Sequence, residues 1–374
     1  MSAQPQSPVA PNPVESLFQN AEDLLTSQSE IRKRVKKKLV KRSTADRSQS
    51  IRRSVQFSFA ALNLYLGIQF YMWVRFYESS GASKAVDRPA GVEGWLPIAA
   101  LMNMKYVLLT GTAPVVHPAG MFLLIAFLGM SFLLRKSFCS WLCPVGTLSE
   151  YLWKLGRRTF RRNFALPRWL DIPLRGLKYV LLGLFVYVIV KMDADAIAGF
   201  LMSPYGLIAD VKMLNFFRFL GTAAAIVIGG LIVFSVFIQN FWCRFLCPYG
   251  ALMGLVSIFS PAKIRRVETA CIDCAKCAKA CPSLLPVDTL VQIRSAECTA
   301  CMECVAACPA EGALHLALPR NRKLSPVAVA AGIAILFFGL VGYAKFSGHW
   351  DTKIPRDVYM QLIPNANEAS HPGM

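Results

Sequence analysis

Two stretches of the chain repeat one cysteine spacing, and this repeat restricts the possible fold more than any other feature. Each stretch places three cysteines two residues apart and a fourth after three more residues, followed by proline. Such close spacing lets one tight loop present three thiolates to one centre, while the fourth thiolate reaches a second centre. The eight residues are Cys271, Cys274, Cys277 and Cys281 in the first run, and Cys298, Cys301, Cys304 and Cys308 in the second.

The spacing is typical of bacterial two-cluster ferredoxins, in which the fourth cysteine of each run ligates the cluster of the other run. It predicts two [4Fe–4S] clusters. Zinc sites usually offer two C-x2-C pairs, and a disulfide framework does not need a duplicated order, so both alternatives fit less well. One cluster is predicted to bind Cys271, Cys274, Cys277 and Cys308, and the other Cys298, Cys301, Cys304 and Cys281.

The chain is too apolar for a water-soluble globular protein. Of its 374 residues, 55% are hydrophobic and only 17% are charged. Such a composition indicates several membrane-spanning helices. Five stretches are apolar enough to cross a bilayer, although the second and third are short. We therefore predict an α-helical polytopic membrane protein with about five spans, at residues 54–76, 119–134, 177–191, 220–238 and 326–344.

The net charge of +19 is distributed in a pattern that indicates membrane topology and not nucleic-acid binding. Segments rich in lysine and arginine alternate with poor ones, which is the positive-inside pattern. It predicts a bacterial inner-membrane protein with a cytoplasmic N-terminus and ferredoxin module and a periplasmic C-terminus. The basic run from Arg32 to Arg42 then acts on the lipid surface. The segments 1–53, 135–178 and 239–325 hold 11, 10 and 10 basic residues, and 77–118, 191–219 and 345–374 hold 3 each.

The chain divides into five parts. No secretory signal peptide is visible, because the first apolar stretch follows a long polar segment. Residues 14–42 fit an amphipathic basic helix on the inner leaflet and an exposed tail equally well. The predicted parts are 1–53, a cytoplasmic basic segment; 54–260, a four-span membrane core; 261–322, an inserted α+β two-cluster ferredoxin domain; 323–345, a fifth transmembrane helix; and 346–374, a periplasmic tail.

The membrane core contains an internal repeat. The pattern C-x3-C-P-x-G-x-L occurs after the second apolar stretch, from Cys139, and again after the fourth, from Cys243. Each half consists of a span, an outer semi-apolar segment (Gly94–Gly111 or Ala198–Leu220), a second span and this motif. Two similarly oriented halves imply a duplicated two-span unit with a pseudo-two-fold axis along the membrane normal.

The two motifs present four further thiols at the cytoplasmic side of the membrane. Residues four apart share one face of a helix, and the following proline marks the helix end. If the halves pack symmetrically, the four thiols converge. Such a set suits a third iron–sulfur cluster or a metal such as copper; a redox dithiol in each motif and inert structural cysteines are the alternatives. The residues are Cys139, Cys143, Cys243 and Cys247.

Two C-x3-C-P motifs on membrane helices, followed by a two-cluster ferredoxin run, resemble the membrane polyferredoxin family of NapH, NosR and CcoG. The resemblance covers about 54–322. It implies electron transfer, from quinol to a periplasmic reductase system in NapH-type proteins, or to copper during oxidase assembly in CcoG-type proteins. The chain departs from each pattern. It lacks the flavin domain of NosR-type proteins, has only 345–374 after its fifth span where CcoG-type proteins have a domain, and extends beyond the point where NapH ends.

Other candidate groups lie in the outer segments. His117 and His349 could hydrogen-bond a quinol headgroup or take up its proton, but an interfacial histidine is more simply satisfied by water. Asp210 could accept a proton, although a solvated loop charge is the simpler role. Trp95 and Trp350 fit an aromatic belt at the membrane surface.

The sequence thus favours a membrane-bound iron–sulfur protein that transfers electrons between the quinone pool and a periplasmic or membrane redox partner, as a quinol dehydrogenase subunit. In this reading the clusters supply the redox chemistry and the chain supplies ligands and spacing. One alternative is a copper reductase or assembly factor for a respiratory enzyme, with copper on the C-x3-C-P thiols. Another is a redox maintenance subunit without turnover of its own. No C-x2-C-H haem motif or glycine-rich dinucleotide fingerprint is present.

Overall fold

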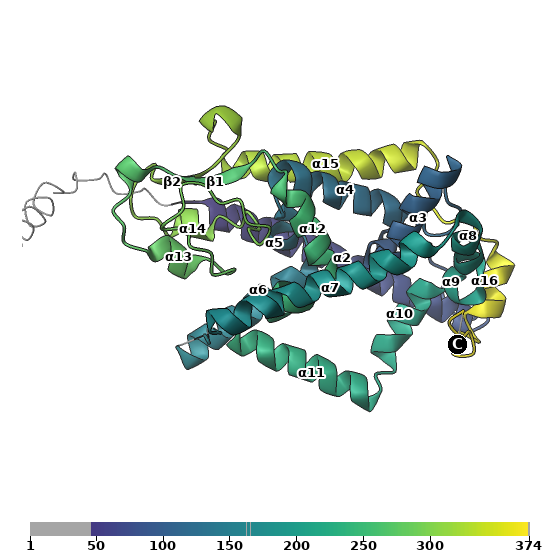
Figure 1. Cartoon of the computed structure of the whole chain (residues 1–374). Coiled ribbons are helices and arrows are strands. Elements are labelled where there is room, and N and C mark those ends of the chain that lie inside the picture. The colour runs from purple at the N-terminus through teal and green to yellow at the C-terminus, as the bar shows by residue number, and fades with distance from the viewer. Residues whose placement is uncertain (1–45, 162, 165, 373–374) are drawn as a thin grey trace, which may run out of the picture. The chain divides into compact units, whose positions relative to one another are not determined.

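The computed structural model describes residues 46–161, 163–164 and 166–372, and shows a helical bundle with a small module of strands and short helices at one end (Figure 1). The predicted basic helix over 14–42 lies outside these ranges. All five predicted apolar stretches form helices. Their bounds are α2 Ser48–Glu78, α4 Pro118–Leu134, α7 Arg168–Lys191, α11 Thr222–Phe237 and α15 Pro326–Phe346.

Four of these helices expose apolar side chains, as helices in contact with lipid do. Leu64, Val180, Ile226 and Ile335, one on each of α2, α7, α11 and α15, are all more than 60% exposed. In water so much apolar surface would be unfavourable. The helices α2, α7 and α15 are long and apolar enough to cross a membrane, and a fourth span results if α11 is counted with α10. The chain is therefore a membrane protein, while the full count of five spans remains a prediction.

The helix α4 lies at the centre of the bundle. It has 17 residues, fewer than α2, α7 and α15, and it packs against α3, α12 and α15. Protein surrounds it on nearly every side, so that Ala119, Leu124, Ala126 and Met130 are at most 1% exposed. Its neighbours therefore replace lipid around most of its apolar side chains, while Ile125, Phe132 and Leu133 stay exposed.

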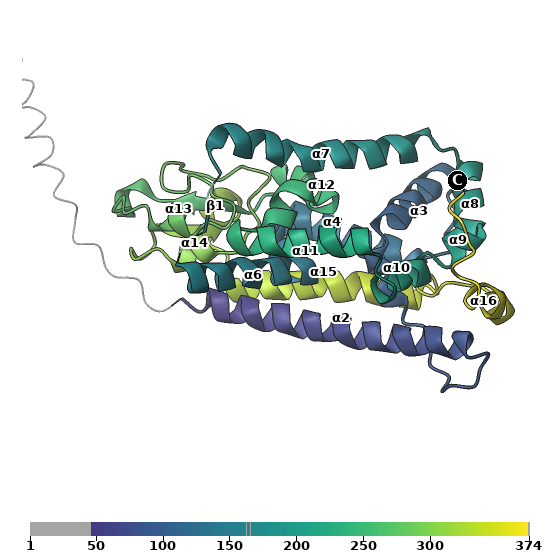
Figure 2. The same cartoon turned by 90° about the horizontal axis from the view of Figure 1, so that it is seen from below.

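Short helices connect the long ones at the end of the bundle opposite the ferredoxin module. This end is called the outer end below, and the end beside the module is called the inner end. In Figure 2, α8, α9, α10 and α16 lie at the end of the bundle opposite the ferredoxin module. Two of these helices begin with side-chain caps, because Asp193 and Ser203 accept hydrogen bonds from the backbone N–H groups of Ala196 and Gly206. The bend between α10 and α11 is 81°. The outer elements are η1 Ala90–Trp95, α3 Pro97–Thr110, α8 Ala194–Met202, α9 Pro204–Leu207 and α10 Ala209–Arg218.

The connections at the inner end carry the C-x3-C-P motifs. The short helix α5 follows α4, and the short π-helical segment η2 follows α11. A longer helix begins immediately after each motif. These elements are α5 Ser137–Trp141, α6 Pro144–Phe160, η2 Trp242–Leu246, which is a short π-helical turn, and α12 Pro248–Ile258.

The ferredoxin module is built on one antiparallel pair of strands. The strand β1 (Lys263–Arg266) pairs with β2 (Leu314–Ala317), with Ile264 opposite Leu316. Both of these side chains are at most 2% exposed and form the core beneath the cysteine loops. The sheet therefore ties the beginning of the module to its end. Between the strands lie η3 Glu268–Ala270, α13 Lys276–Ala280 and α14 Glu303–Ala306, and η4 Pro319–Asn321 follows β2.

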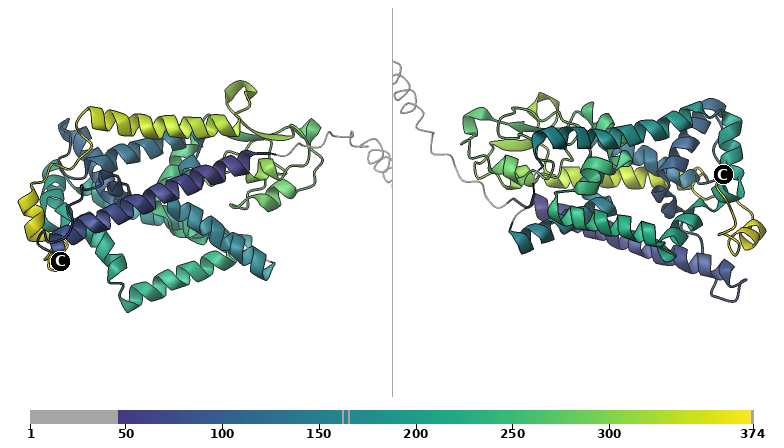
Figure 3. Two further views of the ribbon diagram at one scale, coloured as in Figure 1. Left: turned by 180° about the vertical axis from the view of Figure 1, so that it is seen from behind. Right: turned by 60° about the horizontal axis from the view of Figure 1, so that its bottom comes forward.

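The C-terminal segment is not the simple polar tail that the sequence predicts. It contains α16 (Arg356–Leu362), which lies at the outer end of the bundle near the end of α2 (Figure 3). Tyr359 packs edge-on against Trp73 of α2 at 5.0 Å between ring centroids, and Ile363 is 2% exposed. The sequence gives no sign of this helix, because its apolar residues are scattered and show no period, yet they suffice to fix a short helix against an existing surface.

Candidate functional site

Both C-x3-C-P motifs end one helical segment and begin the next. Cys139 lies within α5 and Cys243 within η2, whereas Cys143 and Cys247 have non-helical backbone conformations and cap α6 and α12. The proline that follows each cap occupies the first helical position, where its missing N–H is not needed. The prediction that this proline marks a helix end is confirmed. The expectation that both cysteines of a motif share one helix face is wrong, because the second cysteine lies between two helices.

The helix that follows each motif orients the second thiol. Gly146 N–H donates a hydrogen bond to Cys143 Sγ at 3.5 Å, and Gly250 N–H donates to Cys247 Sγ at 3.2 Å. These N–H groups lie at a helix N-terminus, whose partial positive charge would help to hold a thiolate ligand. Gly146 is required sterically, since a Cβ at this position would lie 2.2 Å from the carbonyl oxygen of Cys139. The glycine of the motif therefore positions a thiol, a role that the sequence analysis did not identify.

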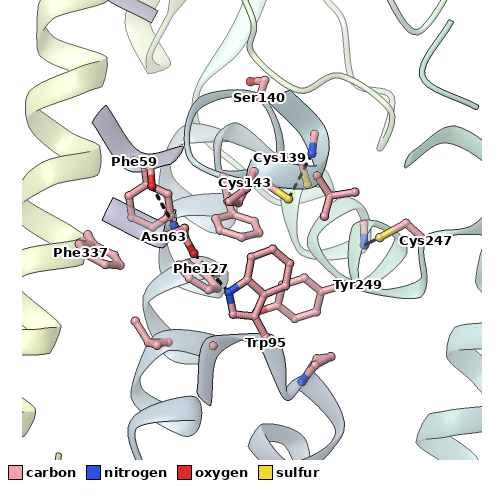
Figure 4. Close-up of a pocket in the computed structure, with 18 of the residues that line it drawn as sticks. Phe59, Asn63, Trp95, Phe127, Cys139, Ser140, Cys143, Cys247, Tyr249 and Phe337 are labelled. Atoms are coloured by element: carbon pink, nitrogen blue, oxygen red, sulfur yellow. Dashed lines mark hydrogen bonds between the residues drawn. The ribbon is translucent and has the colours of Figure 1, made fainter. Parts of the chain in front are cut away.

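A single cavity of about 940 Å³ joins the two motifs. It extends from the cysteines toward Asn63 and Trp95 in the outer half of the bundle, where Trp95 Nε1 donates a hydrogen bond to Asn63 Oδ1 at 3.2 Å (Figure 4). Aromatic rings line its middle. The cavity wall includes the four motif cysteines, Cys139, Cys143, Cys243 and Cys247, and the rings of Phe59, Phe127, Phe138, Phe337 and Tyr249.

The donor set around this cavity consists of free thiols. All twelve cysteines fall within the described ranges, and none forms a disulfide. Among the described residues, no three His, Cys, Asp or Glu side chains are arranged to hold a single metal ion. Four thiols around a roomy cavity fit a thiolate-ligated centre larger than one ion.

The two ferredoxin runs fold alike. In each run the residue before the second cysteine and the residue after it have positive φ, which non-glycine residues rarely adopt. Such a conformation costs on the order of 1–3 kcal/mol and persists only where the surroundings impose it. The same positive φ angles at equivalent positions indicate that both loops curve in the same way. Such a shape fits two loops that each surround an iron–sulfur cluster. The angles are 48° at Asp273 and 54° at Ala275, and 50° at Ala300 and 59° at Met302.

The fourth cysteine of each run lies with the other run. Cys281 lines a small pocket together with the first three cysteines of the second run. Burial raises the pKa of the Cys308 thiol, and the neighbouring thiols of Cys274 and Cys271 raise it further. These groupings match the spacing, although the role of each cysteine as a ligand remains a prediction. They are Cys281 with Cys298, Cys301 and Cys304, and Cys308 with Cys271, Cys274 and Cys277.

The second ferredoxin run docks directly on the first C-x3-C-P motif. Ser140 and Trp141 lie between the two cysteines of that motif and donate hydrogen bonds to the carbonyl oxygens of Thr299 and Ala300, at 2.6 and 3.2 Å. Cys301 of the same loop also lines the large cavity. The membrane thiols and the second ferredoxin run are therefore neighbours.

A buried charge cluster fixes this docking. Arg52 of α2 is 1% exposed, and its Nη2 lies 2.6 Å from Glu150 and 2.8 Å from Glu303, at the start of α14. Lys154 contacts the same two carboxylates at 2.6 and 2.8 Å. Burial alone would raise the pKa of Glu150, but the hydrogen bond and charge of Arg52 outweigh it and lower the pKa to about 2. The sequence analysis missed this cluster because Arg52 and Glu303 are 251 positions apart.

A second buried network lies at the outer end of the bundle. Arg88 donates hydrogen bonds to Glu93 at 2.8 Å and to Asp210 at 2.7 Å, and Thr352 donates to Glu93 at 2.6 Å. His117 is 1% exposed, and its Nε2 donates to the carbonyl oxygen of Gly206 at 3.0 Å. The expectations that His117 is satisfied by water and that Asp210 is a solvated loop charge are therefore wrong, because tertiary packing buries both.

The network holds its groups in charged forms. Burial alone would raise the pKa of Glu93, but Arg88 and His117 outweigh it and lower the pKa to about 2. Burial alone would lower the pKa of His117, but the hydrogen bond and charge of Glu93 raise it. Glu93 therefore stabilises the fold above its ordinary pKa of about 4.5, and this stabilisation is lost as pH falls toward 2. His117 stabilises it below its ordinary pKa of about 6.5, and this is lost as pH rises through the raised pKa.

Replacing Glu93 by glutamine is expected to destabilise the protein at neutral pH by about 3 kcal/mol, since about 1.36 kcal/mol corresponds to each pKa unit. The difference from wild type should shrink as pH falls from about 4.5 toward 2, where Glu93 becomes protonated in both states. Thermal unfolding followed by tryptophan fluorescence across this range measures it. Asp87→Asn is the matched control, because Asp87 adjoins Arg88 but is exposed. A pH-independent difference would contradict the charge assignment.

Lipid-facing helices joined to a ferredoxin module with two cysteine runs define a class, the membrane-bound iron–sulfur proteins of electron transfer. Comparison with known protein families assigns the chain to the same class. The 4Fe-4S binding domain family matches residues 116–163 and again 220–266, each segment containing one C-x3-C-P motif. The 4Fe-4S dicluster domain family matches residues 263–309, which contain both ferredoxin runs. No solved structure matches the chain significantly.

Relatives place the chain in a particular family. It is 51% identical over 326 residues, 86% of the chain and 91% of the relative, to YccM of Escherichia coli (strain K12), which is named provisionally as an electron transport protein. It is 30% identical to the regulatory protein NosR of Pseudomonas aeruginosa, over 43% of the chain and 22% of that protein. It is 25% identical to the ferredoxin-type protein NapH of E. coli, over 44% of the chain and 56% of that protein. The chain belongs to this NapH/NosR-type family of 4Fe–4S membrane proteins, which includes YccM.

Proposed function

We propose that the protein oxidises a membrane quinol and delivers the electrons to a redox partner protein. One observation carries the proposal: a single cavity links the outer half of the membrane bundle to the four motif cysteines and to Cys301 of the ferredoxin module. A cavity of this kind can hold a substrate at one end and present thiol ligands at the other. The resemblance of the chain to quinol-linked relatives points the same way.

The cavity wall suits a quinol. Its middle is aromatic, and the side chains of Asn63 and Tyr249 are polar groups that could orient a headgroup there. Pockets for small molecules commonly combine apolar walls with a few convergent polar groups. Leu62 of α2 and Phe338 of α15 also line the cavity and are 36% and 65% exposed, which supports access from the lipid between these helices.

The cysteines fall into three groups that fit thiolate-ligated centres. The two ferredoxin groups would each hold a [4Fe–4S] cluster, and the four motif cysteines would hold a third centre. Bound iron–sulfur clusters supply one-electron transfer, which the side chains of the protein cannot perform. The chain contributes position: Ser140 and Trp141 hold the second run against the membrane thiols, while Cys274 of the first run is exposed. The exposed run is thus available to a partner.

Metal and redox analysis tests this function. Protein purified without oxygen is expected to contain at least about eight iron atoms for the two ferredoxin clusters, and more if the motif cysteines hold a cluster. A water-soluble quinol analogue should reduce the clusters, as followed by EPR. Iron at this level without reduction by any quinol analogue would contradict the quinol role, and copper bound at the motif cysteines would favour the copper reductase alternative. Zinc in place of iron would refute the cluster assignment.

We also propose a cytoplasmic N-terminus and ferredoxin module and a periplasmic C-terminus, in an inner membrane protein with a duplicated two-span unit. The alternating basic residues support this orientation, and the repeated match of one domain family supports the duplication. A reporter active only after export should be active when fused at Met374. The same reporter fused in the loop after Arg320 should be inactive. An inactive C-terminal fusion would mean that one of the five spans is wrong.

A further inference from the structure

A cluster of linked ion pairs beside the motif cysteines contains more basic than acidic side chains. Lys178 is fully buried and bonds both carboxylate oxygens of Glu297 at 2.6 Å. Arg244 pairs with Asp171 at 2.6 Å. Among the described residues this cluster joins four cations to two anions: Lys136, Lys178, Arg175 and Arg244 with Glu297 and Asp171. Glu150 also lines the cavity, but it pairs with Arg52 outside the cluster.

Lys136 shares its nearest carboxylate, Glu297, with a second lysine, Lys178. Lys136 is 3% exposed and lines the cavity that contains the motif cysteines. Its Nζ lies 4.0 Å from Glu297 Oε2, beyond hydrogen-bond distance, and Glu297 is already engaged by Lys178 and by Tyr179 at 3.1 Å. Within the ranges that the structure describes, the Lys136 ammonium makes no hydrogen bond. A lysine ammonium has three donors, so all three remain available to an occupant of the cavity.

A buried ammonium without hydrogen bonds is costly unless nearby negative charge compensates it. Glu297 compensates Lys136 only in part, because the same carboxylate also pairs with Lys178. Cys139, Cys243 and Cys247 also lie near enough that their thiolates would favour the charged form of Lys136. Four thiolates carry more negative charge than a bound iron–sulfur core neutralises, and copper(I) thiolates are likewise anionic. A neutral dithiol or an empty cavity would leave Lys136 with only the carboxylate that it shares with Lys178.

We propose that Lys136 provides the counter-charge for an anionic, thiolate-ligated metal centre held by the four motif cysteines, and thereby raises its reduction potential. The inference rests on the proposed function of these cysteines as ligands. Reduction of such a centre adds one electron and binds no proton, so its negative charge grows by one. A nearby fixed cation stabilises the reduced form more than the oxidised form. Lys136 is in this sense a positioning residue that acts on potential without being a ligand.

The test is an anaerobic redox titration of the membrane centre by EPR, with metal analysis of the same samples. Lys136→Gln should lower the ratio of reduced to oxidised centre at a fixed potential by roughly tenfold, about 59 mV for one electron. Lys136→Arg should restore the wild-type value, because it keeps the charge. Lys345→Gln is the matched control, since Lys345 lines the same cavity but lies at the far end of the 21-residue helix α15.

The outcomes separate this inference from the function on which it rests. Wild-type protein with no metal beyond the two ferredoxin clusters refutes the ligand role of the motif cysteines, and the inference with it. A third centre whose potential is unchanged in Lys136→Gln overturns the inference alone. Loss of the centre in Lys136→Gln together with its recovery in Lys136→Arg supports the counter-charge role. Loss of the centre in both variants overturns the inference, because a retained positive charge then fails to preserve the centre. Metal analysis distinguishes iron from copper.

Discussion

Replacement of Cys143 or Cys247 by serine is expected to abolish quinol-driven electron transfer while the two ferredoxin clusters still assemble. Each cysteine caps the helix after its motif and faces the common cavity. A serine hydroxyl keeps the cap but is a poor ligand for a soft metal centre. Changes to groups that merely orient a ligand already cost about 10–100-fold in affinity or activity, so we expect a loss of at least roughly 100-fold. Quinol-dependent reduction of an artificial acceptor measures it.

The reciprocal variant is the control. Cys274→Ser should disturb the exposed ferredoxin run and leave the membrane centre in place, because Cys274 lies outside the cavity that the motif cysteines line. EPR spectra of the variants then distinguish the two kinds of centre. If Cys143→Ser and Cys247→Ser retain full electron transfer, the motif cysteines are structural and the route through the cavity does not exist.

Replacement of Arg52 by leucine is expected to destabilise the protein by about 3–5 kcal/mol and to release the ferredoxin module from the membrane helices. The change removes one partner of a buried ion pair and leaves Lys154 as the remaining cation at Glu150, with a hydrogen bond from Gln56. It also removes the contact between α2 and Glu303 that holds the second run in place. Thermal unfolding in detergent measures the stability, and limited proteolysis of the module measures its release.

Arg53→Leu is the matched control for this experiment. Arg53 is the next residue on the same helix, but it is exposed, and its side chain bonds the carbonyl oxygen of Gln49 at 3.2 Å. Exposed substitutions of this kind usually change stability by less than about 0.5 kcal/mol. Equal effects of the two variants would show that α2 responds to loss of any arginine, and that the buried cluster has no special role in docking.

Short-range patterns in the sequence were sufficient for the parts of the protein whose structure depends on neighbouring residues. The five apolar stretches predict five helices because helical apolar surface is a local property, and the proline of each C-x3-C-P motif predicts a helix end because it restricts the residue before it. The ferredoxin spacing also predicts which cysteines gather, since the crossing of the fourth ligand is a property of the repeat.

Only the tertiary structure decided where buried charges meet. Arg52 pairs with Glu303 across 251 positions, Arg88 with Asp210 across 122, and Lys178 with Glu297 across 119. Such pairs leave no mark in local periodicity, because each charge alone looks like a surface residue. One signal was present, since Lys178 lies within a predicted span, and an ionisable residue there usually faces the interior of the bundle.

The same distinction explains the error at His117 and the unexpected helix in the C-terminal segment. A histidine before a proline in an outer loop has no local reason to be buried, and it becomes buried only because the chain brings Glu93, Gly206 and Thr352 around it. The sequence by itself thus determined the cysteine groups, the membrane helices and the motif ends, which depend on spacing and polarity along the chain. The tertiary structure decided that four distant thiols line one cavity and that Lys136 beside them shares its nearest carboxylate with Lys178, because burial and pairing depend on which segments pack together.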